Sequence, residues 1–136
     1  MSITHALQGD FNMWDKKQED LEPACRIEPS TPEDVSTIIK AAIQHQCHFA
    51  VKGGGHSRIA GSSNAESGIT IDMRKFDDIV ISKDKKTVKI GAGNTWGPVY
   101  KTLEKQDLSV VGGRVSDVGV SGLLLGGECD RRPCYQ

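Results

Sequence analysis

The clearest periodic pattern in the chain lies between residues 31 and 44. Its apolar side chains recur at helical spacing and form one stripe: Val35, Ile38, Ile39, Ala42 and Ile43. Thr31 is a typical N-cap, Pro32 suits the first helical position, and two acidic residues follow in the first turn. The pattern therefore predicts an amphipathic helix that buries one face.

Short apolar segments on both sides of this helix are typical of strands. The order strand, helix, strand predicts a βαβ unit with a parallel pair. The segment after the helix is expected to be a buried strand that ends at a glycine run. A charged turn between two β-branched segments further along predicts a hairpin. In chain order the predicted strands are residues 25–28, 48–52, 68–73, 78–82, 87–93 and 108–114.

A second helix is predicted to begin after Thr95, because the threonine hydroxyl suits the N-cap position. Its inner face would carry Trp96, Val99, Tyr100 and Leu103. We interpret the tryptophan and the tyrosine as core packing in preference to ligand stacking. Together with the strands, this predicts an α+β fold.

Size and charge restrict the possible functions. The chain has 136 residues and a net charge of -1, which suits one domain and favours neither nucleic acid nor an anionic membrane surface. No apolar run is long enough for a transmembrane helix. The start of the chain lacks the basic and apolar regions of a signal peptide, so a cytoplasmic location is expected. Residues 1–20 are mostly polar and are expected to form an arm that leans on the body through Trp14.

The four cysteines lack the paired spacing of a zinc site, and we predict no metal centre. Cys25 and Cys47 flank the predicted strand and helix at the start of the βαβ unit, a βα pair. They are expected to remain thiols in the cytosol, although secretion would allow them to pair. Cys129 and Cys134 lie in a tail without apolar periodicity, residues 128–136.

Two glycine-rich segments are the candidate binding elements. The first, V-K-G-G-G-H-S at residues 51–57, follows a predicted parallel strand, and ligands gather at the carboxyl ends of such strands. Its backbone could wrap a dinucleotide phosphate, although an ordinary turn is the alternative. The serines and asparagine at 62–64 could line a phosphate path or form a plain loop. The second segment, residues 112–127, could grip the other end of one long ligand, with Arg114 near a phosphate or in a surface salt bridge.

Five segments in this order resemble the amino-terminal part of the FAD-binding domain in berberine-bridge-enzyme-like, or p-cresol-methylhydroxylase-type, FAD-linked oxidases. They are residues 23–35, 49–57, 71–73, 88–96 and 110–127. The resemblance implies the first portion of a two-subdomain α+β domain, with residues 21–127 as a partial FAD-binding domain. Within this family, the motifs resemble those of fungal members that act in secondary-metabolite pathways.

The resemblance also implies roles for individual residues. Gly53, Gly54 and Gly55 would form the pyrophosphate loop of FAD, and His56 is the candidate for a covalent bond to the flavin 8α-methyl carbon. Further contacts to FAD are implied for Ser57, Gly61, Ser62, Gly112, Gly113, Val118, Gly119, Gly122, Gly126 and Gly127. The implied chemistry is two-electron oxidation of a small organic substrate, with hydride passing to flavin N5 and oxygen reoxidising the flavin.

The chain departs from the family pattern near its end. Glu128 interrupts the glycine run, and Cys129 lacks the context of a second flavin attachment. The substrate domain of the family has no counterpart here, and no residue can be named as a catalytic base. We therefore expect a truncated flavin-binding part. The alternatives are a non-catalytic remnant that binds a nucleotide or a partner, and a fragment that does not fold stably because it exposes sheet edges and apolar surface.

Overall fold

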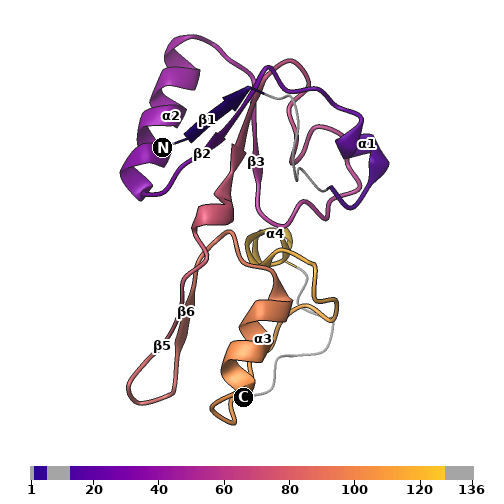
Figure 1. The fold of residues 1–136 in the computed structure, drawn as a ribbon. Coiled ribbons are helices and arrows are strands. Elements are labelled where there is room, and N and C mark those ends of the chain that lie inside the picture. Colours follow the sequence, from indigo (N-terminus) through magenta and orange to yellow (C-terminus); the bar gives the residue numbers. More distant parts are fainter. Residues whose placement is uncertain (1, 6–12, 128–136) are drawn as a thin grey trace.

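The computed structural model describes residues 2–5 and 13–127, which form two neighbouring groups of elements (Figure 1). The elements in chain order are β1 (Ser2–His5), α1 (Lys16–Glu19), β2 (Cys25–Glu28), α2 (Pro32–Gln44), β3 (Phe49–Lys52), β4 (Ile69–Asp72), the 3-10 turn η1 (Met73–Lys75), β5 (Ile79–Ile81), β6 (Val88–Ile90), α3 (Trp96–Glu104) and α4 (Val120–Gly126). The elements up to η1 form the first group, and those from β5 onward form the second.

The first group is built on a four-stranded sheet with the order β1-β2-β4-β3. The βαβ unit β2-α2-β3 is present. The expected direct pairing of its two strands is wrong. Both pair in parallel with β4, which lies between them. The side chains of Thr70 and Ile71 in β4 are fully buried, and such a strand suits the position where both edges are hydrogen-bonded.

Helix α2 confirms the periodic pattern and its cap. The Thr31 hydroxyl accepts from the backbone N–H of Asp34, and the Asp34 carboxylate accepts from the Thr31 N–H. Ile38 packs with Ile27 and Ile71 of the sheet in one apolar cluster. Ile43, expected in the buried stripe, is 68% exposed. Each helical residue is turned by about 100° from the one before it, so burial of Ala42 turns Ile43 away from the sheet.

The second group packs the hairpin β5–β6 against α3 and α4. Its core consists of Trp96, Val99, Leu103 and Val120, with partly buried hairpin side chains around them. The hairpin, the second helix and the core role of Trp96 are as expected, and Tyr100 is half-buried beside them. The predicted strand at residues 108–114 is wrong. This segment is irregular. Leu108 and Val110 pack on the core cluster instead of joining a sheet, while Val111 is 83% exposed.

The segment before residue 21 contains more structure than a polar arm. β1 extends the sheet by pairing antiparallel with β2, and the buried side chains of Met13 and Gln18 tie α1 to the body. Trp14 does contact the body, as expected, through the ring of His56. The domain boundaries at residues 20 and 127 stay a prediction. The tail at 128–136, with Cys129 and Cys134, lies outside the described residues.

Candidate flavin cleft

The glycine run begins where β3 ends at Lys52. Gly53 and Gly54 pass close to the segment that leads into α4, and a Cβ on Gly54 would lie 2.5 Å from the backbone nitrogen of Gly119. Gly55 has a φ of 70°, a left-handed conformation that glycine adopts without strain. The glycines therefore make a turn whose shape depends on contact with the second group of elements.

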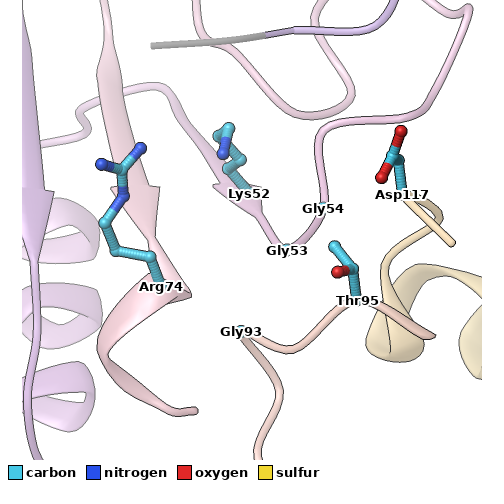
Figure 2. Close-up of a pocket in the computed structure, with 7 residues that line it drawn as sticks. All are labelled: Lys52, Gly53, Gly54, Arg74, Gly93, Thr95 and Asp117. Atoms are coloured by element: carbon cyan, nitrogen blue, oxygen red, sulfur yellow. The ribbon is translucent and has the colours of Figure 1, made fainter. Parts of the chain in front are cut away.

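A cleft of about 420 Å³ lies beside this turn, within the volume range of small-molecule sites. Both groups of elements contribute to its walls, as Figure 2 shows. The side chains of Lys52 and Arg74 come from the sheet group, and those of Thr95 and Asp117 come from the second group. The complete lining is Lys52, Gly53, Gly54, Arg74, Gly93, Thr95 and Asp117.

The cationic wall of the cleft is organised around one buried carboxylate. Asp72, at the end of β4, has no exposed side-chain surface and lies 3.0 Å from Arg26, 3.5 Å from Lys52 and 3.2 Å from Arg74. Burial lowers the pKa of Lys52, while the neighbouring Asp72 carboxylate acts in the opposite direction. The buried carboxylate thus holds Lys52 and Arg74 at the carboxyl ends of two parallel strands, where an anionic ligand would meet them.

The first set of predicted site residues is only partly gathered at this cleft. Gly53 and Gly54 line it, whereas the rest of the loop makes contacts of its own. His56 stacks on Trp14 with ring centroids 4.3 Å apart. The Ser57 hydroxyl accepts from the Ile59 N–H, and the Ser62 hydroxyl donates to the Ile59 carbonyl while accepting from Gln18. Gly61 has a φ of 83° and open space around it.

Several predicted site residues of the second glycine-rich segment make packing contacts within the second group of elements. Gly112 and Gly113 lie against the indole of Trp96, and a Cβ on Gly113 would be 2.6 Å from the ring. The Val118 carbonyl accepts from the backbone N–H of Trp96, and the Val118 side chain packs on the apolar core. A Cβ on any of the three last glycines, Gly122, Gly126 and Gly127, would meet open space. Arg114 is exposed and does not line the cleft.

Sequence reasoning missed five of the lining residues: Lys52, Arg74, Gly93, Thr95 and Asp117. A signal was present for the two cations. Lys52 ends one predicted strand, and Arg74 directly follows another, residues 68–73, so the carboxyl ends of parallel strands bring them together. Nothing local indicated Asp117, because its place depends on how the loop before α4 packs on Gly54.

Two features are absent from the part of the chain that the structure describes. None of its helices combines the length and the apolar character that crossing a membrane requires. Residues 2–5 and 13–127 also contain no group of three histidine, cysteine or acidic side chains arranged to hold a metal ion.

Comparison with known proteins shows the family to which this chain belongs. The family model described as FAD binding domain matches residues 23–133. The chain is 45% identical over 114 residues to the FAD-dependent monooxygenase tpcD of Cochliobolus heterostrophus. It is 44% identical over 114 residues to the FAD-dependent monooxygenase FUP4 of Fusarium proliferatum. Each match covers 84% of this chain and 22% of the relative, so the chain spans under a quarter of these proteins.

Solved structures share the fold. The 6-hydroxy-D-nicotine oxidase of Arthrobacter nicotinovorans matches with a TM-score of 0.81 and 25% identity, over 90% of this chain and 27% of that one. The berberine-bridge-enzyme-like 1 protein of Physcomitrella patens matches with a TM-score of 0.73 and 26% identity, over 82% of this chain and 24% of that one. These matches confirm the expected α+β fold and the family resemblance. The chain belongs to the FAD binding domain family, and its cofactor is FAD.

Proposed function

We propose that the cleft beside Gly53 and Gly54 holds the pyrophosphate of FAD, and that the chain is the flavin-binding part of an oxidoreductase. The carrying observation is that Lys52 and Arg74 line the same cleft as the two glycines. A glycine turn lets backbone N–H groups approach an anion closely, and the two cations supply the opposite charge. The glycines and the two cations therefore suit a diphosphate, while the Asp117 carboxylate in the same lining adds one negative charge.

His56 is the proposed point of covalent attachment to the 8α-methyl carbon of the flavin. Forming this bond replaces the N–H of the imidazole and one C–H of the methyl group. The two electrons and two protons released leave the flavin reduced, and oxygen then takes both to give hydrogen peroxide. The position of His56 directly after the glycine turn supports this assignment, because the imidazole belongs to the residue that follows the proposed pyrophosphate loop.

Bound FAD would supply two-electron oxidation of a small organic substrate, by accepting hydride at N5. The chain's own residues would orient the cofactor and balance its charge. The two fungal relatives are FAD-dependent monooxygenases, which supports a place in fungal secondary metabolism. Because the chain spans 22% of these relatives, the substrate site is assigned to no residue here.

A titration with FAD, followed by calorimetry, tests the proposed cleft. Arg74→Gln removes one lining cation, while Lys75→Gln is a matched control on the same 3-10 turn outside the lining. Loss of one charge-assisted hydrogen bond should weaken FAD binding by about tenfold to a hundredfold. The control should bind within about threefold of wild type because an exposed charge contributes little. Equal binding by both variants, or none by the wild type, would refute the cleft.

The covalent bond needs its own measurement. The chain is incubated with FAD in air, denatured and precipitated, and the pellet is examined for flavin absorbance and for the added mass of FAD. Wild type should retain flavin, and His56→Ala should lose it while still binding FAD reversibly. Binding of ADP as tightly as FAD, with no retained flavin in either chain, would favour the alternative of a nucleotide-binding module.

A further inference from the structure

Residues 13–22 contact the loop that follows the glycine turn, and they lie before the stretch that matches the family model, which begins at residue 23. We define the strap as residues 13–22, which include α1. The strap contacts the loop that runs from Gly55 to Glu66 along most of its length. Since this loop follows the glycine turn directly, whatever fixes it also fixes His56.

The strongest contact joins Trp14 to His56. Their rings are stacked, with centroids 4.3 Å apart and planes 18° from parallel. The backbone N–H of Trp14 donates to the Gly55 carbonyl at 3.1 Å, so the backbone next to His56 is held as well. One face of the imidazole is therefore covered by the indole, and only the other face and the ring edges remain for a ligand.

Buried amides anchor the strap behind this pair. Gln18 is fully buried and donates to the Ile59 carbonyl and, at 2.6 Å, to the Ser62 hydroxyl. Asn64 is also fully buried, and its amide donates to the carbonyls of Gln18 and Leu21 at 2.8 Å each. The Thr70 hydroxyl of β4 donates to the remaining oxygen of Asn64. Asn64 is thus hydrogen-bonded through both its amide nitrogen and its amide oxygen, whereas the Gln18 side chain is held through its nitrogen alone and its buried oxygen has no partner among the described residues. These hydrogen bonds favour one arrangement of strap and loop.

Although stacked, Trp14 is 56% exposed. In the part of the chain that the structure describes, this exposed surface is available for contact with a ligand. Its indole lies beside the ring proposed to meet the flavin, so a flavin seated at His56 would come within contact of the same indole. The exposed part of Trp14 would then contact the cofactor itself.

We propose that Trp14 is a positioning residue for the flavin: its indole sets the plane of the His56 imidazole and leaves one face of that ring for the cofactor. This inference rests on the proposed function. Stacking of aromatic rings favours offset parallel arrangements at this separation, which suits the role. The strap then acts on the cofactor through His56 and through direct contact with the flavin.

Three variants separate the two actions of Trp14. Trp14→Phe keeps an aromatic ring on His56 but removes the indole, which quenches flavin fluorescence by electron transfer at contact distance. Trp14→Ala removes both. Glu19→Ala is the control, because it changes an exposed side chain of the same strap. FAD affinity, fluorescence of the bound flavin and flavin retained after denaturation are measured for each, with urea unfolding to record stability.

We expect Trp14→Ala to bind FAD about threefold to tenfold more weakly, as loss of one aromatic stack implies, and to retain less flavin. Trp14→Phe should keep affinity and retention but show brighter bound flavin, a change that loss of stability alone would not produce. Glu19→Ala should match wild type in all three. If wild type and Trp14→Ala bind, retain and quench flavin alike, the role of Trp14 is refuted while the proposed function stands. If wild type binds no FAD, both fall.

Discussion

Gly54 and Gly119 touch backbone to backbone across the junction between the two groups of elements. A Cβ on Gly54 would lie 2.5 Å from the nitrogen of Gly119 and 2.6 Å from its Cα. Gly119 has a φ of -68°, which any residue can adopt, so space and not backbone conformation requires glycine here. The two glycine-rich segments of the sequence therefore meet at one contact that fixes the shape of the flavin loop.

Gly119→Ala should destabilise the chain because its Cβ would collide with the Gly54 backbone. Overpacking of this kind costs about 1–3 kcal/mol, and two backbone segments have little freedom to relax. Gly122→Ala is the matched control in α4, where a Cβ meets open space. It should be neutral or stabilise by about 0.5–1 kcal/mol. Urea unfolding of both variants measures the difference, and equal midpoints would show that the contact is not tight.

Asp72→Asn should destabilise more strongly. The buried carboxylate pairs with Arg26, Lys52 and Arg74, and breaking a buried ion pair costs about 3–5 kcal/mol. The same change at Asp107, which is exposed and has a φ of 55° that asparagine tolerates, should have little effect. Thermal unfolding compares the two. A similar melting temperature for Asp72→Asn and wild type would mean that the cations are held by their other contacts.

The parts of this fold that the sequence predicts are those specified by neighbouring residues. The helix α2 has its cap, its proline and its apolar stripe within fourteen positions, and the hairpin has its turn between its own strands. The insertion of β4 between β2 and β3 has no local signal, because each pairing joins residues far apart in the chain. Helix α4 was hidden by its glycines, which have low helix propensity.

The candidate site divides in the same way. The motif with Gly53 to His56 indicates where a flavin loop begins, since it follows a strand directly. The motif does not reveal that Gly113 is needed by the indole of Trp96, because that contact forms only when α3 packs under the loop. Nor does it reveal that Trp14 stacks on His56, forty-odd positions later in the chain. The cofactor contacts that the resemblance implies for these glycines therefore stay predictions, beside the packing contacts that the structure shows.

Thr31→Ala should destabilise α2 by about 1 kcal/mol, because the hydroxyl caps the backbone N–H of Asp34.

The pKa of Asp34 is lowered by hydrogen bonds from the backbone and side chain of Ser30, with a further one from the Thr31 N–H. A lowered pKa means that this carboxylate stabilises the fold above its unfolded pKa, and that the effect is lost as the pH falls through the folded pKa. Asp34→Asn should therefore flatten the acid limb of a pH-stability profile measured by urea unfolding. Ser36→Ala, an exposed change in the same helix, should leave it intact.

The two described cysteines should differ in their reaction with iodoacetamide. Cys25 is partly buried, and burial, followed by the nearby Cys47, raises the pKa of its thiol. Because the thiolate is the reacting form, alkylation of Cys25 should require a higher pH than alkylation of the exposed Cys47. The raised pKa also means that stability linked to this thiol is present below its unfolded pKa and lost as the pH rises through the folded value.

Peptide mass spectrometry after timed labelling gives both rates from one sample, and it separates these sites from the cysteines of the tail. Unfolding in urea supplies the control, because it removes the burial and should bring the two rates together. Faster labelling of Cys25 than of Cys47 in the folded chain would contradict the packing of Cys25 on the apolar cluster between the sheet and α2.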